Sequence, residues 1–246
     1  MLANMVVQDD ARERQLIELF KLKRIEGAGR ADTDAELVVD GATIPFELKS
    51  STDDSVTTVR DFGPSHVEKW KNKHWLIGFY EKDGVTLKYC IYGSPRKMAP
   101  WVKEKEDYIR VDFELAKTVP DLITVEILYQ VLGKKDVYTV QDARLLHKRQ
   151  YTSEQYLEQR DLQNGYSPKR MLAILKDRCR YIISRGSTLN NPHIPGSYFA
   201  GWEHITAKHA ERLRKLVAEA LAEEAKELKK TAQELKESAR KIDKAT

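Results

Sequence analysis

The chain has 246 residues, 41% of them hydrophobic and 33% charged, and its 42 basic and 38 acidic side chains leave a formal net charge of +4. This composition excludes an intrinsically disordered chain and predicts a globular protein made of one large domain or of a core with a helical addition. No apolar run approaches the roughly 18 residues needed to cross a bilayer, and the N-terminus has no signal-peptide pattern, so we expect a cytoplasmic protein without a membrane partner. The small basic excess permits binding to nucleic acid without requiring it.

The first expected element is an amphipathic helix over residues 9–23, with Glu13 in its first turn. Two strands are expected next, over residues 32–39 and 42–50. Between them, Asp40-Gly41 is a strong signal for a two-residue turn. The sequence therefore predicts a β-hairpin directly after the first helix.

The predicted turn determines which residues of the hairpin face each other. Leu37 lies opposite Ile44, and Asp34 lies opposite Glu47. Because side chains alternate along a strand, Asp34, Glu47 and Lys49 share one face, while apolar side chains share the other and can pack on the first helix. Directly opposed side chains are about 5 Å apart at Cβ, so the two carboxylates are expected to repel each other.

A pair of opposed carboxylates beside a lysine indicates a particular kind of chemistry. Either Asp34 or Glu47 holds a proton, or a cation lies between them. Magnesium suits the second arrangement, because it prefers oxygen ligands and often combines one or two protein carboxylates with phosphate oxygens. The ammonium of Lys49 can orient a water or stabilise charge on a phosphate. These residues predict metal-assisted phosphodiester hydrolysis, and the alternative is an exposed hairpin face whose charges have no function.

The rest of the chain predicts a mixed α/β protein. In chain order we expect a short helix over residues 64–72, strands over 75–80 and 85–92, a helix over 168–184, a loop over 186–201 and a helix from about residue 203 onward. The expected fold class is a mixed central β-sheet flanked by helices, with a helical C-terminal region. The predicted segments are a core over residues 1–95, additional elements over 96–202 and a long C-terminal helix over 203–246.

The C-terminal helix carries two interleaved heptad repeats. One consists of large apolar residues and the other of alanines: Leu221, Leu228, Leu235 and Ile242, and Ala218, Ala225, Ala232 and Ala239. Such a seam is typical of a coiled coil, and the Glu/Lys-rich flanks fit a solvated helix. The helix either pairs with a second copy of the chain, which gives a homodimer, or lies on its own domain.

The hairpin and its flanking elements resemble the PD-(D/E)xK nuclease superfamily. The resemblance rests on residues 29–34 (GRADTD) and on Phe46-Glu-Leu-Lys49 in the next strand, and it covers roughly residues 9–92. It implies the order helix, three strands, helix, strand, and a magnesium-dependent nuclease in which manganese can substitute. Thr33 stands where the family has a proline.

The resemblance also implies a set of site residues. The expected metal ligands are Asp34, Glu47 and the main-chain carbonyl of Leu48, and Lys49 completes the catalytic set. The first helix is similar to that of archaeal Holliday-junction resolvases, which carries a further catalytic glutamate. By this likeness Glu13 is a candidate, with Glu18 as the second choice. Alternatively, Glu13 is a first-turn acid that favours the helix dipole.

The part of the chain beyond residue 92 has no counterpart in the compact resolvases. Such additions are typical of type II restriction endonucleases, which use them to read bases and to dimerise. The resemblance therefore implies a homodimer that hydrolyses double-stranded DNA at a short specific sequence, with a cognate DNA methyltransferase as a further partner. Two alternatives stay open: a repair or junction nuclease that selects DNA shape, and a non-catalytic DNA-binding or coiled-coil protein.

Basic and polar residues outside the hairpin are candidates for contacts with DNA. Those near the hairpin suit the phosphate backbone: Arg30, Arg60, His66, Lys69 and Lys71. Those farther along the chain suit base edges in a groove: Arg96, Lys97, Lys169, Arg170, Asn190, Asn191 and His193. The alternative for the lysines is an ordinary solvated face, and for residues 185–193 it is a plain surface connector.

Overall fold

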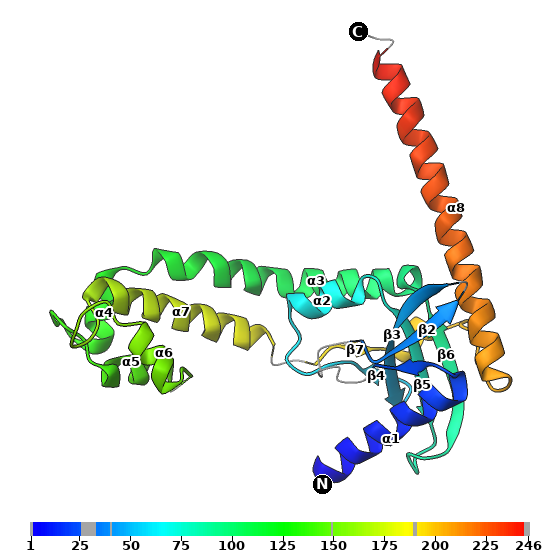
Figure 1. The fold of residues 1–246 in the computed structure, drawn as a ribbon, viewed down its shortest axis with the longest axis horizontal. Coiled ribbons are helices and arrows are strands. Elements are labelled where there is room, and N and C mark those ends of the chain that lie inside the picture. The colour runs from blue at the N-terminus through cyan, green and yellow to red at the C-terminus, as the bar shows by residue number, and fades with distance from the viewer. Residues whose placement is uncertain (1, 26–32, 40, 149, 189–190, 244–246) are drawn as a thin grey trace. The chain divides into compact units, whose positions relative to one another are not determined.

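The computed structural model describes residues 2–25, 33–39, 41–148, 150–188 and 191–243 (Figure 1). The chain forms two compact units. Unit 1 consists of Met1–Thr58, Val67–Lys103 and Pro192–Thr246, and unit 2 of Val59–His66 and Glu104–Asn191. Both ends of the predicted middle segment, residues 96–103 and 192–202, belong to unit 1.

Unit 1 is built around a five-stranded sheet with the order β1-β2-β3-β5-β6. Its strands are β1 (Lys23–Arg24), β2 (Ala35–Val39), β3 (Ala42–Ser51), β5 (His74–Tyr80) and β6 (Leu87–Gly93). Strands β3 and β5 run parallel, and the other neighbours run antiparallel. A parallel pair needs a crossover connection, and α2 (Pro64–Trp70) lies in it. The expected mixed sheet flanked by helices is confirmed.

The β2–β3 hairpin has the predicted register. Its pairs are Val39 with Ala42, Leu37 with Ile44, and Ala35 with Phe46. Gly41 has a φ of 81°, a conformation that glycine adopts without the steric cost of a side chain. The other residue of the predicted turn, Asp40, lies outside the described residues. Strand β2 begins later than predicted, but the Asp34 N–H still donates to the Phe46 carbonyl at 3.2 Å, so Asp34 continues the pairing.

The first helix, α1 (Leu2–Phe20), begins earlier and ends earlier than predicted. Residues 2–8 contain no proline or glycine, so nothing in the sequence prevents the helix from extending through them. The helix ends where Lys21 adopts a left-handed backbone with φ of 52°. Glu13 consequently lies in the middle of α1, and the predicted first-turn position was wrong.

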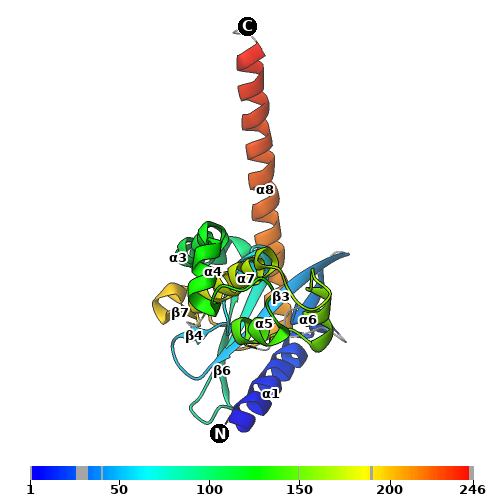
Figure 2. The same cartoon turned by 90° about the vertical axis from the view of Figure 1, so that its left-hand side faces the viewer.

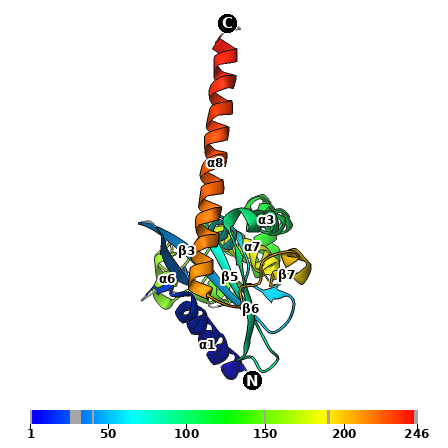
Figure 3. The ribbon, with the colours of Figure 1, turned by 90° about the vertical axis from the view of Figure 1, so that its right-hand side faces the viewer.

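One face of the sheet packs against α1 and the beginning of α8 (His209–Asp243) (Figure 3). Leu16 of α1, Phe46 and Leu48 of β3, and Val217 of α8 are buried in one hydrophobic cluster. The apolar face of the hairpin therefore packs on the first helix, as predicted. Burial of each large apolar side chain contributes about 1.5–3 kcal/mol, which makes this cluster a main source of stability for unit 1.

The opposite face of the sheet is covered by α2 and by the first part of α3 (Pro95–Thr118). Three fully buried indole rings meet there, from α2, β5 and α3: Trp70, Trp75 and Trp101. The centroid of the Trp70 ring lies 5.3 Å from that of each of the other two rings. This aromatic contact holds α2 close above β3 and β5.

Only the beginning of α8 is packed on unit 1. Leu213 and Val217 are buried, whereas residues 222–238 are exposed, with Leu228 64% and Leu235 67% accessible. The helix begins at His209 and not near residue 203. The side chains of Ala239 and Ile242, the last members of the two heptad repeats, lie outside the described part of α8.

Unit 2 is helical, and α4–α7 are visible in Figure 2. Besides the rest of α3, its helices are η1 (Val119–Leu122), α4 (Val125–Leu132), α5 (Val140–His147), α6 (Ser153–Glu158) and α7 (Pro168–Ser187). The predicted helix over residues 168–184 is confirmed as α7. The hydroxyl of Ser167 caps it by accepting from the Arg170 N–H at 3.2 Å. The unit has its own hydrophobic core, which includes Leu128, Tyr156 and Met171.

Two short segments outside the predicted strands pair with each other in unit 1. Strand β4 (Val56–Thr57) pairs antiparallel with β7 (His193–Ile194). The predicted loop over residues 186–201 therefore contains a strand, and it also contains the short helix η2 (Gly196–Phe199). Two-residue strands leave no periodic pattern, so sequence alone does not reveal them. Across the described residues, no helix has both the length and the apolar content needed to span a membrane.

Candidate functional site

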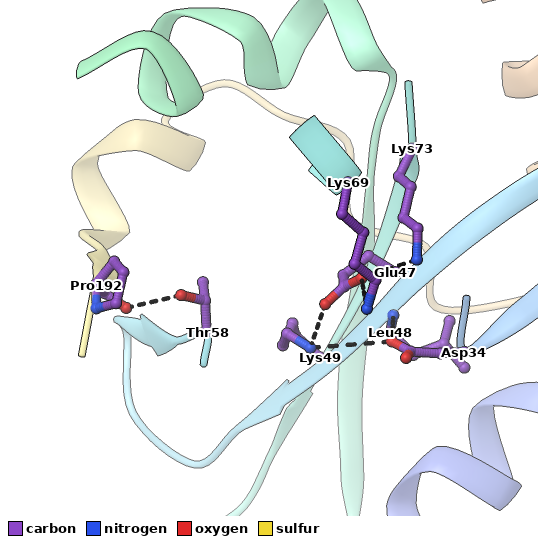
Figure 4. Close-up of polar contacts among 8 residues, drawn as sticks. All are labelled: Asp34, Glu47, Leu48, Lys49, Thr58, Lys69, Lys73 and Pro192. Carbon is purple, nitrogen blue, oxygen red and sulfur yellow. Dashed lines mark hydrogen bonds and ion pairs between the residues drawn. The ribbon is translucent and has the colours of Figure 1, made fainter. Parts of the chain in front are cut away.

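The centre of the candidate site is the carboxylate of Glu47, which is 1% exposed and surrounded by three lysines (Figure 4). The Lys49 ammonium lies 2.8 Å from Oε1. The ammonium groups of Lys69 and Lys73 each lie 3.4 Å from Oε2. Both carboxylate oxygens are therefore engaged with cations.

Asp34 completes this cluster from the neighbouring strand. Its Oδ2 accepts a hydrogen bond of 2.7 Å from the Leu48 N–H and lies 3.9 Å from the Lys49 ammonium. Lys49 is thus within ion-pair distance of both acids (Figure 4). The prediction that Asp34, Glu47 and Lys49 meet on one face of the hairpin is confirmed.

The sheet and its crossover bring the other two lysines to Glu47. Glu47 lies beside Trp75 in the parallel pair of β3 and β5, so both face the side covered by α2. Lys69 is in the last turn of α2, and Lys73 directly precedes β5. The buried Trp70, between these two lysines in sequence, holds the end of α2 over β3.

The electrostatics of the cluster follow from burial and from these contacts. Burial alone raises the pKa of Glu47, but Lys49 and the other two ammonium groups outweigh it and hold the pKa at about 2. Burial raises the pKa of Asp34 despite the opposing effect of Lys49, and Glu47 adds to the rise. The pKa of Lys49 is raised because the two acids outweigh the effect of its burial. Glu47 and Lys49 are therefore a charged pair at neutral pH.

The three lysines change the interpretation of the opposed acids. The sequence suggested that either a proton or a divalent cation must offset the repulsion between Asp34 and Glu47. In the structure the ammonium groups of Lys49, Lys69 and Lys73 offset this repulsion. From the sequence, only Lys49 was expected beside the two acids. Among the described residues, no three His, Cys, Asp or Glu side chains form a group that holds a metal by itself.

Glu13 faces the same region from α1. It lines a cavity of about 200 Å³ together with Leu48, Lys49, Ser50 and Thr58. Burial raises the pKa of Glu13, and the negative charge of Asp34 raises it further. The charge of Asp34 therefore affects the protonation of Glu13. The Thr58 hydroxyl donates to the Pro192 carbonyl at 3.0 Å, which ties the end of β4 to the chain before β7 (Figure 4).

The remaining candidates for DNA contacts are distributed over both units. Lys69 belongs to the acid–lysine cluster, and exposed Lys71 pairs with Glu68 at 2.6 Å. The Arg96 guanidinium pairs with Glu227 at 2.7 Å, and the Lys97 ammonium lies over the Trp202 ring.

His193 lies in β7, with Nδ1 3.1 Å from the Thr57 hydroxyl. The candidates in unit 2 are Arg60, His66, Lys169, Arg170 and Asn191. Arg30 and Asn190 lie outside the described residues.

Lys73 was considered as a phosphate contact, but its place beside Glu47 was not predicted. Its side chain is 6% exposed, and burial lowers its pKa even though Glu47 is beside it. In the sequence it looks like one of three alternating lysines on a polar segment. The available signal was its position immediately before the buried strand β5.

No model of a known protein family matches the chain, and no curated protein matches it either. The candidate site therefore rests on its own residues and their geometry.

Proposed function

We propose that the chain is a metal-dependent nuclease that hydrolyses phosphodiester bonds of double-stranded DNA. The observation that carries this proposal is the meeting of Asp34, Glu47 and Lys49 at one point, with a cation within 4 Å of both acids. The element order is in keeping with a PD-(D/E)xK-type core: α1, the β1–β3 strands, α2 and then β5. A fold built only for stability avoids placing two acids side by side, whereas cation-assisted chemistry needs them there.

The donor groups fit a magnesium ion. The Lys49 ammonium lies 2.8 Å from the Glu47 carboxylate and 3.9 Å from that of Asp34, which supports a shared cation position beside the two acids. The Leu48 N–H points to Asp34, and because N–H and C=O of one residue point to the same side of an antiparallel strand, the Leu48 carbonyl opens to the same edge. These oxygens are of the kind magnesium prefers, and it completes its shell with water and phosphate oxygens. Manganese is expected to substitute for it.

When bound, the metal would lower the pKa of a coordinated water and neutralise charge on the phosphate. The protein residues have separate tasks around it. Asp34 and Glu47 hold the ion, and Lys49 orients the attacking water or stabilises negative charge that develops on the phosphate. Glu13, which lines the same cavity as Lys49, would accept a proton or bind a water there.

We further propose that the enzyme is a homodimeric type II restriction endonuclease, which cuts at a short specific sequence and is paired with a DNA methyltransferase. The exposed Leu228 and Leu235 of α8 support a second copy as the partner. A structure-selective nuclease with the same core remains the alternative. Digestion of unmodified phage DNA in magnesium distinguishes the two, because discrete fragments indicate a sequence-specific enzyme and preference for branched substrates indicates the other.

The site assignment is tested by three nearly isosteric variants: Asp34→Asn, Glu47→Gln and Lys49→Met. Each is expected to reduce the rate of DNA cleavage in magnesium by about 100-fold or more, because each removes one charged group from the reacting centre. Duplex binding in calcium is expected to persist. The control is Glu219→Gln, which removes an exposed carboxylate of α8 that pairs loosely with Lys215 at 4.0 Å. Cleavage at the control rate by any of the three variants would reject that residue's role.

A further inference from the structure

Three ammonium groups surround the Glu47 carboxylate. Its Oε1 is held by Lys49 at 2.8 Å, and its Oε2 is shared by Lys69 and Lys73 at 3.4 Å each. A divalent ion bound to Glu47 would add two positive charges beside these three groups. The repulsion favours a state in which at least one ammonium has moved away from the carboxylate.

The exposure of the lysines indicates which one is released. The Lys73 side chain is 6% exposed, whereas those of Lys49 and Lys69 are 15% and 17% exposed. Lys69 is also in the last turn of the short helix α2, on a long flexible side chain. Lys49 lies between the two acids and remains within reach of Asp34. Lys69 is thus the cation that can leave Glu47 at the lowest cost.

An ammonium released in a partly buried site needs a new anion. An uncompensated charge in such surroundings is unfavourable, so the released group favours a negative ligand that enters the site. For a nuclease that ligand is a phosphate of the DNA backbone.

We propose that Lys69 changes its partner, from Glu47 in the free protein to a DNA phosphate in the complex. This inference rests on the proposed function for the identity of its ligand. It makes Lys69 a phosphate-binding residue whose availability is set by Glu47. Metal binding at Glu47 and phosphate binding at Lys69 consequently strengthen each other, and by linkage the coupling is the same in both directions.

The inference is tested without cleavage, through binding of a fluorescent duplex at low salt in metal-free buffer. Glu47→Gln removes the charge that retains Lys69, so the variant is expected to bind the duplex about 5-fold more tightly than the wild type. The double variant with Lys69→Met is expected to lose this gain. The control pairs Glu47→Gln with Lys88→Met, which removes an exposed lysine of β6. The control is expected to keep the gain.

A second measurement uses the unmutated site. In the wild type, calcium is expected to steepen the slope of log affinity against log salt by about 0.9, the effect of one additional phosphate contact. In Lys69→Met the slope is expected to be the same with and without calcium. Circular dichroism verifies that each variant is folded.

The inference is overturned if Glu47→Gln does not bind DNA more tightly, if the gain persists without Lys69, or if no variant binds the duplex. It is supported if the gain is present and depends on Lys69. Cleavage assays are read separately. If the protein shows the Lys69-dependent gain but never cuts DNA, the proposed nuclease activity is wrong and the change of partner by Lys69 stands. If the protein cuts DNA but shows no gain, the nuclease activity stands and the change of partner is wrong.

Discussion

Buried ionisable residues of unit 1 reach two different charge states. Glu47 is surrounded by ammonium groups and stays ionised, with its pKa held at about 2. His74 is 4% exposed, and its Nδ1 lies 2.6 Å from the Tyr92 hydroxyl. Burial lowers the pKa of His74 to about 4, so the ring is neutral in the folded protein at pH 7. The difference arises because an ion pair offsets desolvation and a neutral hydrogen-bond partner does not.

His74 is expected to make unit 1 less stable in mild acid. Its pKa is about 4 in the folded state and about 6.5 in the unfolded state, so between these values only the unfolded chain binds the proton. Stability is therefore lost as the pH falls from about 6.5 to 4, by about 3 kcal/mol in total. Denaturant unfolding of the wild type and of His74→Gln across this range measures the effect. The variant is expected to show the weaker pH dependence, and parallel curves would contradict the assignment.

Two secondary-structure elements of unit 1 depend on different kinds of packing. The hairpin depends on β5 and α2 to bury the back of Glu47, whereas the side chains of α8 from residue 222 to residue 238 are exposed. In the exposed part of α8, the alanines and leucines of the two heptad repeats lie on one side of the helix. An exposed apolar seam on a long helix is a common interface between two chains.

Substitutions in this seam are expected to disrupt the proposed homodimer. Leu228→Glu with Leu235→Glu places two charges where the partner helix packs, and a monomer is expected in light scattering coupled to size-exclusion chromatography. The control variant, Lys230→Gln with Gln233→Glu, changes the net charge equally on the opposite side of the helix. It is expected to remain dimeric. A wild-type monomer at micromolar concentration would exclude this interface.

At the scale of the whole molecule, the chain has two separate hydrophobic cores. The core of unit 1 includes Leu16 and Phe46, and the core of unit 2 includes Tyr156 and Met171. Unit 1 is assembled from three chain segments and unit 2 from two. Cores without shared residues are expected to unfold in separate transitions.

Differential scanning calorimetry is expected to show two transitions that respond to different changes. Gly165→Ala places a Cβ 2.2 Å from the Tyr138 carbonyl oxygen, so it is expected to destabilise unit 2 by about 1–3 kcal/mol. Gly186→Ala in α7 meets no atom within 4 Å and is the control, expected to stabilise α7 by up to about 1 kcal/mol. Calcium is expected to raise only the transition of unit 1. A single transition that shifts both with Gly165→Ala and with calcium would contradict independent unfolding of the two units.

Local signals in the sequence predicted the parts of the structure that depend on neighbouring residues. The Asp-Gly turn signal and the alternation of apolar residues were sufficient for the hairpin register, and so for the meeting of Asp34, Glu47 and Lys49. The helix α7 was recognisable because Ser167 and Pro168 are typical of a helix start. The helix α3 and the short helices between α3 and α7 were not predicted, since the sequence over residues 95–165 gives only weak periodic signals.

The sequence by itself determined the hairpin, its apolar face and the face that carries the acids, because turn geometry and side-chain alternation are properties of adjacent residues. Only the tertiary structure decided that Glu47 is buried and that Lys69 and Lys73 surround it. These lysines reach Glu47 through the parallel pairing of β3 with β5 and the packing of α2 on the indole cluster. Contacts of that kind join residues far apart in the chain, and no local pattern encodes them.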